Sequence, residues 1–266
     1  MFRGASLMEE IIEVSPDFWN IRGSFKIGGV VDIKTHASLV RLANGNFVFL
    51  DSYSLGRGAR ERVSEIMGAG GVLEAILNLH PFHTVHVERM HELYPQARLY
   101  GTVRHKERFP DLPWEDELTE EPALHALYAE DFEFSVPRGV DFVSDNENIH
   151  FASVLVLHKA SRTIHVDDTF MYLELPLPLR LLGWKDSLGF HPTLAKALER
   201  RAGAAAEFRD WAGELIEQWR DAENLCAAHT APLLASANRG GAVSQRLEKA
   251  LRRCEPKLRI HERRFG

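Results

Sequence analysis

The stretch Ala75-Ile-Leu-Asn-Leu-His80-Pro-Phe-His83-Thr-Val-His86 decides how the chain is interpreted. An apolar run ends here in three histidines spaced three residues apart. Neutral imidazole is the commonest protein ligand for zinc and similar metals, and it binds without adding charge. Imidazoles at the carboxyl end of one strand can converge on a single point. The stretch therefore predicts a buried strand followed by a metal site.

The same three histidines have a second interpretation. Pro81 is well placed to occupy the first position of a helix, because proline is favoured there. In that case the imidazoles belong to a solvated helical turn and bind nothing. Whether the chain supplies further histidines and carboxylates at suitable positions distinguishes the metal site from the helical turn.

Composition places the chain among ordinary soluble globular proteins. Its 266 residues are 45% hydrophobic and 26% charged, and we find no repeat or linker that divides them. We therefore predict a single domain over residues 1–266, with residues 1–8 as a candidate disordered extension. A net charge of -6 gives no electrostatic reason to expect nucleic acid as a partner.

Cysteine use and hydropathy bear on the compartment. The two cysteines, Cys226 and Cys254, rule out a disulfide framework and a cysteine-built zinc site, and they fit a reducing environment. No apolar run approaches the roughly eighteen residues of a membrane span, and the first residues do not resemble a signal peptide. The sequence predicts a cytoplasmic protein with no membrane partner.

Strand patterns dominate the first half of the chain. Asn44-Gly45 between two apolar runs predicts a β-hairpin, and Gly28-Gly29 predicts another turn. Apolar and alternating runs predict strands over 10–14, 18–25, 37–42, 47–50, 75–79, 97–101, 124–128, 132–136, 149–157, 163–166 and 225–229.

Helical periodicity is clearest late in the chain. Residues 208–219 place apolar side chains at i, i+3, i+4 and i+7, which predicts an amphipathic helix whose tryptophans pack in the core. Further helices are predicted over 60–67, 87–94 and 242–253. Residues 106–122 are expected to form a surface excursion, and 176–192 a loop or broken helix.

Three other predicted strands carry metal-binding side chains at their ends. His150 stands at the start of one strand, and Asp167-Asp168 directly follow another. His229 ends the strand that begins at Leu225 and is followed by a proline-containing turn. A single histidine of this kind is usually structural, but together these residues favour the metal site.

In this order the positions resemble the metallo-β-lactamase superfamily across most of the chain. Residues 35–51 resemble its opening hairpin and the Asp that follows, and 75–86 resemble the strand and loop of its HxHxDH motif. His150 is similar to a lone histidine of the superfamily, Asp168 to a bridging carboxylate, and His229 to its terminal histidine.

The resemblance implies an α+β fold, a four-layer αββα sandwich of two mixed β-sheets flanked by helices, with metals at one edge. It assigns His80, His83 and His150 to the first metal and makes Asp168 the bridging, catalytic carboxylate. His86 and His229 complete a weaker second site. The nitrogen-rich set favours one or two zinc ions, with iron or manganese as alternatives.

The chain also departs from the motif. Its spacing is His80-x-x-His83-x-x-His86, so His80 is displaced by one residue and needs a bulge or is lost as a ligand. Val85 occupies the position of the motif's Asp and cannot bind a metal. We therefore expect one good site and one weak or vacant site. Asp167 replaces a glycine and is either an acceptor that orients a ligand imidazole or a simple turn residue.

The function these observations favour is hydrolysis of an ester, lactone, thioester or related bond in a small molecule by metal-bound hydroxide. One alternative is a protein that keeps the fold, has lost its chemistry and binds a small molecule or partner; another is a diiron redox protein. His36 and His165 are expected to line the mouth of the site. The leucines of 175–182 and Trp184 suggest an apolar lid over it. The sequence predicts no oligomeric state.

Overall fold

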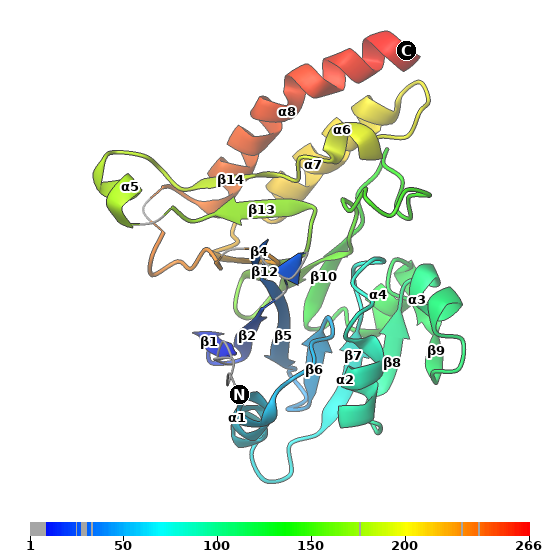
Figure 1. Cartoon of the computed structure of the whole chain (residues 1–266), viewed down its shortest axis with the longest axis vertical. Coiled ribbons are helices and arrows are strands. Elements are labelled where there is room, and N and C mark those ends of the chain that lie inside the picture. The colour runs from blue at the N-terminus through cyan, green and yellow to red at the C-terminus, as the bar shows by residue number, and fades with distance from the viewer. Residues whose placement is uncertain are drawn as a thin grey trace, which may run out of the picture.

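A computed structural model describes residues 9–266 except residues 25, 28–30, 33, 176, 230 and 239 (Figure 1). The predicted extension at residues 1–8 and the predicted Gly28-Gly29 turn lie outside the described residues. The remaining chain forms two sheets with helices on their outer sides, as the sequence predicts.

The first sheet has seven strands in the order β1-β2-β5-β6-β7-β8-β9. Strands β6 to β9 are parallel to one another, so their carboxyl ends meet at one edge of the sheet. The predicted hairpin joins β5 and β6, and Gly45 supplies the positive φ of 87° that its turn requires. The strands are β1 (Glu10–Ser15), β2 (Phe18–Gly23), β5 (Thr35–Arg41), β6 (Phe47–Leu50), β7 (Leu73–Leu77), β8 (Arg98–Gly101) and β9 (Trp114–Leu118).

The second sheet has four strands in the order β10-β11-β12-β15. Its last pair, β12 and β15, is parallel, which again brings two carboxyl ends to the same edge. The strands are β10 (Phe132–Ser135), β11 (Leu155–His158), β12 (Thr163–Val166) and β15 (Asn224–Ala227). Two short hairpins complete the strands: β3 (Lys26–Ile27) with β4 (Val31–Asp32), and β13 (Phe170–Leu173) with β14 (Ser187–Phe190).

Helices α1 (Arg57–Met67) and α2 (Val87–Leu93) pack on the outer face of the first sheet, and α7 (Ala204–Gln218) and α8 (Val243–Phe265) on that of the second (Figure 1). The other helices are α3 (Val103–Arg108), α4 (Pro122–Leu127), α5 (Leu177–Leu181) and α6 (Leu194–Ala197). No helix in the described part of the chain is both long enough and apolar enough to cross a bilayer.

Three buried apolar groups define the four layers. Alternate residues of β6 belong to different groups because side chains alternate across a strand. Phe47 and Phe49 pack with residues of α1 and α2, whereas Val48 and Leu50 pack between the two sheets. The third group joins the second sheet to α7 and α8 and contains Trp211, which confirms the packing role predicted for this side chain.

The predicted strand 124–128 is wrong, because these residues form the end of α4. Pro122 occupies the helix start, where its missing N–H is not needed, and Leu124 and Tyr128 are buried four residues apart on one face. The predicted strand 149–157 forms only at its end. Val154 donates its N–H to the carbonyl of Leu79 instead of to a neighbouring strand.

The predicted surface excursion over 106–122 and the predicted loop or broken helix over 176–192 both contain regular structure. Residues 106–122 include the end of α3 and all of β9, which adds an edge strand to the first sheet. Residues 176–192 include α5 and β14. The last helix runs past the predicted end and through Pro256, because Leu258 and His261 continue its buried face.

Candidate metal centre

The carboxyl ends of four strands bring the predicted site residues to one edge of the sandwich. Because β6 and β7 are parallel neighbours, Asp51 and the loop after β7 lie together. In the other sheet, the parallel pair β12 and β15 brings Asp167 and Asp168 close to His229 in the same way. The side chains that follow these strands are Asp51, His80, His83, Asp167, Asp168 and His229. His150 joins them from the loop before β11.

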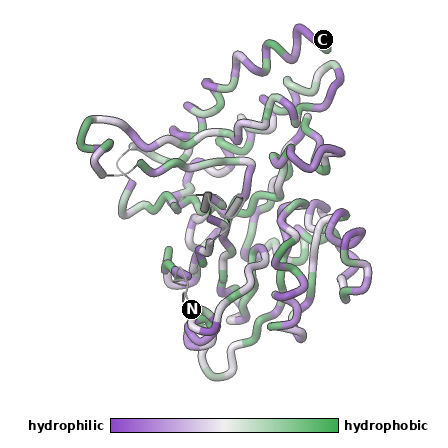
Figure 2. The backbone as a smooth tube through the Cα atoms, in the orientation of Figure 1, coloured by the Kyte–Doolittle hydropathy of each residue, from purple (hydrophilic) through white to green (hydrophobic). Residues whose placement is uncertain are grey.

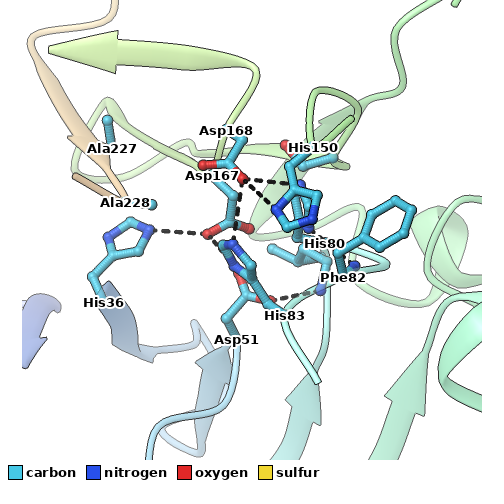
Figure 3. A network of polar contacts seen from close by, with 12 residues as sticks. His36, Asp51, His80, Phe82, His83, His150, Asp167, Asp168, Ala227 and Ala228 are labelled. Carbon is cyan, nitrogen blue, oxygen red and sulfur yellow. Dashed lines mark hydrogen bonds and ion pairs between the residues drawn. The ribbon is translucent and has the colours of Figure 1, made fainter. Parts of the chain in front are cut away.

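Asp168 lies at the centre of four imidazoles, of which those of His80, His83 and His150 are labelled in Figure 3. Its carboxylate is buried, and its Oδ1 lies 2.8 Å from His229 Nε2. The other oxygen, Oδ2, is 3.5 Å from His80 Nε2, 3.6 Å from His83 Nε2 and 3.9 Å from His150 Nδ1. Four of the five predicted histidine ligands therefore converge on the predicted bridging carboxylate.

The imidazoles of His83 and His229 have an acceptor facing each of their two nitrogens. His83 Nδ1 lies 3.2 Å from Asp167 Oδ1, and His229 Nδ1 lies 3.1 Å from the carbonyl oxygen of Lys34, while both Nε2 atoms face Asp168. A neutral ring carries only one proton, so one nitrogen of each ring then presents a lone pair to an acceptor. A lone pair facing a carboxylate requires a proton or a cation between them.

The charges around His83 agree with this geometry. Burial alone lowers the pKa of this imidazole, but Asp167 and then Asp168 outweigh burial and raise the pKa well above its ordinary value. Burial likewise raises the pKa of Asp168, while His229, His83 and His80 hold it well below the usual range. The pocket thus favours one positive charge beside Asp168, as a proton or as a metal ion.

His80 differs from the other imidazoles. The backbone N–H of Phe82 donates to its Nδ1 at 3.1 Å, so the neutral ring carries its proton on Nε2, toward Asp168. The side chain is fully buried, and burial followed by the charge of His83 lowers its pKa to about 3. To bind an ion through Nε2, the neutral His80 ring has to move that proton to Nδ1 and so give up the bond from Phe82.

His86 lies at the side of the group. Its Nδ1 is 2.9 Å from Ser54 Oγ, and its buried Nε2 has no hydrogen-bond partner among the described residues. No contact between His86 and Asp168 occurs in the described part of the chain. Burial and then the charge of His83 lower the pKa of His86 to about 4, so the ring is neutral at pH 7 and available as a ligand.

Asp167 lies on the interior side of the site and contacts the ring of His83. This is the role of orienting a ligand imidazole, one of the two alternatives that the sequence offers. Its Oδ1 lies 3.2 Å from His83 Nδ1 and 3.3 Å from His36 Nε2. Asn20 Nδ2 donates to Nδ1 of His36 at 3.0 Å, which leaves the His36 proton on Nε2, facing Asp167. The chain of contacts fixes the orientation of the His83 ring.

His36 and His165 do not line the mouth of the site, so that prediction is wrong. Both rings are fully buried because β5 and β12 turn them into the interior, where they stack 4.4 Å apart. His165 Nε2 donates to Asp51 Oδ2 at 2.9 Å, and Ser38 Oγ lies 2.9 Å from its Nδ1. These two histidines and Asp167 are close enough to share an ion, but both nitrogens of His165 already have partners.

We expect Asp167→Ala to lower metal affinity 10- to 100-fold, the usual effect of losing a partner that orients a ligand imidazole. Asp167→Asn keeps an oxygen acceptor for His83 Nδ1 and is expected to retain most of the affinity. Competition with a coloured chelator measures both. Equal affinity for Asp167→Ala and the unchanged protein would contradict the orienting role.

Arg22 is a site residue that the sequence interpretation missed. Its buried guanidinium donates to the carbonyl oxygens of Ala227 at 3.0 Å and Ala228 at 2.9 Å, and to Asn20 Oδ1 at 3.1 Å. It thus holds the turn that carries His229. The signal available in the sequence was an arginine inside the predicted strand 18–25; the structure buries all six positions of β2.

A cavity of about 90 Å³ lies beside Asp168 and the histidines around it. Its lining residues include Phe82, Val85, His86 and Asp168. No described residue of 106–122 or 176–192 lines it, so the predicted apolar lid is wrong. Helix α5 instead lies at the far end of the β13–β14 hairpin, which projects from the body of the molecule (Figure 1).

Comparisons with solved structures support the fold. A metallo-β-lactamase from Erythrobacter litoralis matches with a TM-score of 0.59 at 11% identity, over 95% of this chain and 99% of that one. One from Pontibacter korlensis matches with a TM-score of 0.56 at 11% identity, over 92% and 99%. The DIM-1 metallo-β-lactamase matches with a TM-score of 0.58 at 13% identity, over 94% and 100%.

The chain therefore has the metallo-β-lactamase fold, with two mixed sheets and flanking helices, as the sequence predicts. No family model matches the sequence. No match is found among curated proteins either. At 10–13% identity the structural likeness establishes the fold alone. Within that fold, buried groups of His and Asp are compatible with a metal site.

Proposed function

We propose that the protein is a metal-dependent hydrolase that cleaves an ester, lactone, thioester or related bond in a small molecule. The observation that carries the proposal is the convergence of four imidazoles on the buried carboxylate of Asp168, within 3.9 Å. The orientations of His83 and His229 also suit a cation, because their Nδ1 atoms face acceptors and their Nε2 atoms face Asp168.

The donor set fits zinc better than a hard, oxygen-preferring ion. His83, His229, His150 and Asp168 would hold the ion, and His80 would join through Nε2 if its proton moved to Nδ1 and the bond from the Phe82 amide were given up. A bound zinc ion lowers the pKa of a coordinated water from 15.7 to about 7 and so supplies hydroxide at neutral pH. Asp167 keeps the His83 ring in position, and Phe82 and Val85 give the cavity apolar walls that suit a small substrate.

The test begins with the full chain purified without added metal. We expect elemental analysis to find metal, and a panel of esters, lactones and thioesters to include a substrate whose turnover stops with chelator and returns with zinc. His83→Ala should lower kcat/KM more than about 100-fold, since losing even an outer partner costs 10- to 100-fold. His125→Ala is the matched control, because that imidazole donates to Thr119 and stacks on Phe134, with no contact to Asp168.

Full metal content in His83→Ala would refute the ligand assignment, and turnover that survives chelation would refute the mechanism. Metal without turnover of any compound in the panel supports a binding protein, and a diiron content with redox activity supports the oxidoreductase alternative. Iron or manganese in place of zinc, with chelator-sensitive hydrolysis, leaves the proposed reaction intact.

The second metal position can be tested by restoring the missing carboxylate. Val85 lines the cavity and is 69% exposed, so an Asp there fits without burying an unpaired charge. We expect Val85→Asp to raise the metal content from one ion toward two, because paired metal sites use carboxylates to hold the second ion. Val85→Asn has nearly the same shape without the charge, and an equal rise with it would contradict the expectation.

A further inference from the structure

The end of the β13–β14 hairpin exposes large apolar side chains. Leu181 is 78% exposed, Leu182 75% and Trp184 63%, and all three lie within four consecutive residues. Figure 2 shows hydrophobic segments at this projecting end. Scattered exposed apolar residues are normal, but a contiguous set on a projection is typical of an interaction surface.

A basic groove lies directly beside these side chains. Its volume is about 460 Å³, and Trp184 belongs to its wall. Five cationic residues line it, against one carboxylate, that of Asp186. The five are Arg180, Lys185, Arg246, Lys249 and Arg253. The groove is therefore strongly positive on a chain whose net charge is -6.

The charges in the groove are only partly compensated. Arg180 lies 3.4 Å from Glu174 and 4.0 Å from Asp186, whereas Arg246 donates to Asn238 Oδ1, a neutral group. Among the described residues, no carboxylate lies within 4.0 Å of the ammonium groups of Lys185 and Lys249. The groove therefore retains excess positive charge facing solvent.

Helix α8 extends this charge along its length. Residues 243–265 contain eight Lys and Arg against three Glu. Its first half forms one wall of the groove and packs on β14, where Arg253 donates to the carbonyl oxygen of Leu188. The first half of the basic helix and the apolar hairpin end thus meet at the groove, which Trp184, Arg246 and Lys249 line together.

We propose that this surface docks the protein on an anionic phospholipid membrane. Leu181, Leu182 and Trp184 enter the boundary between headgroups and acyl chains, where exposed leucine and tryptophan are stable. The cations of the groove bind the phosphate groups beside them, as basic clusters do at anionic membrane surfaces. The absence of a membrane-length apolar run in the sequence excludes a span, not an association of this kind.

The combination of features favours a membrane over two other occupants. A free phosphate compound would use the groove but leave Leu181 and Leu182 exposed, since neither lines it. A second copy docked by the same face would cover the leucines, but it would place two positive grooves against each other. A membrane surface satisfies the apolar side chains and the cations together.

Co-sedimentation with vesicles tests the proposal. We expect the protein to bind vesicles of equal parts phosphatidylglycerol and phosphatidylcholine, and not pure phosphatidylcholine. Binding should weaken in about 1 M salt, where the Debye length falls to about 3 Å. The double variant Lys185→Glu/Lys249→Glu should weaken binding at least tenfold, because each basic residue near an anionic surface strengthens binding severalfold. Leu181→Ser/Leu182→Ser should weaken it as well.

Two controls match these variants. Arg57→Glu/Arg62→Glu makes the same charge change on α1, where both side chains are exposed and paired with glutamates of their own helix. Ile260→Ser removes an apolar side chain that is 64% exposed on α8 and does not line the groove. Both should bind vesicles like the unchanged protein.

Four results would overturn the proposal. They are no binding to the anionic vesicles, equal loss of binding in test and control variants, and a leucine-dependent dimer in sedimentation that does not bind vesicles. The fourth is release from vesicles by inorganic phosphate at constant ionic strength, which would identify a site for free phosphate. Hydrolase activity toward soluble substrates plays no part in these outcomes, so failure here leaves the proposed function standing.

Discussion

Asp168→Asn is expected to remove the bound metal almost completely. The change keeps the shape of the side chain but deletes the negative charge that four imidazoles face. It also places an amide N–H₂ or a neutral oxygen where a cation requires a carboxylate. We expect metal affinity to fall more than about 100-fold, beyond the 10- to 100-fold cost of losing an outer partner. Elemental analysis and chelator competition measure the loss.

Asp111→Asn provides the matched control, because Asp111 is exposed between α3 and β9. The same change in chemistry there should leave metal content and activity as they are. The folded state of Asp168→Asn has to be verified by its unfolding transition. A folded Asp168→Asn protein that keeps its full metal content would show that Asp168 is not a ligand.

The second large effect is expected from Arg22→Met, and it concerns stability. The methionine keeps most of the volume of the aliphatic part of Arg22. It removes the guanidinium that donates hydrogen bonds to the carbonyl oxygens of Ala227 and Ala228. Each buried polar group left unpaired costs about 1–3 kcal/mol, so we expect unfolding to become easier by about 3–5 kcal/mol. Denaturant unfolding measures this change.

Arg41→Met is the control for this variant. Arg41 also lies in the first sheet, but its side chain is only half-buried; its guanidinium lies 3.4 Å from the half-buried carboxylate of Asp17 and over the rings of Trp19 and Phe47. Ion pairs that solvent reaches contribute at most about 1 kcal/mol. A comparable loss of stability in both variants would contradict the role assigned to Arg22. We also expect Arg22→Met to loosen the His229 turn and so to weaken metal binding.

The strands of the two sheets were predictable where the apolar pattern of the sequence matches the burial of the side chains in the structure. Alternating Phe47 to Leu50 pack on both faces of the first sheet, and Asn44-Gly45 specify the hairpin turn before them. The failures occur where tertiary contacts override the local pattern. Residues 124–128 alternate enough to suggest a strand, but Pro122 and the shared buried face of Leu124 and Tyr128 favour a helix.

The position of the site was predictable from residues at strand ends, and its details were not. Asp168 and the histidines around it could be grouped because they stand at the ends of predicted strands in an order that resembles the superfamily's. His83 Nδ1 faces the carboxylate of Asp167, whereas His80 Nδ1 accepts from the backbone N–H of Phe82. The spacing of the histidines in the sequence does not reveal this difference. The buried pair His36 and His165 could not be told from residues at a pocket mouth, because a strand pattern does not specify depth.

The two consecutive aspartates after β12 contact opposite nitrogens of the same ring: Asp167 contacts Nδ1 of His83, and Asp168 contacts Nε2 and lines the cavity. A single-residue insertion or deletion between Val166 and Asp168 would shift these carboxylates away from the nitrogens that they contact. The length of this connection is therefore fixed by chemistry. The projecting segment between β13 and β14 contributes no described residue to this cavity, so its length does not bear on these contacts.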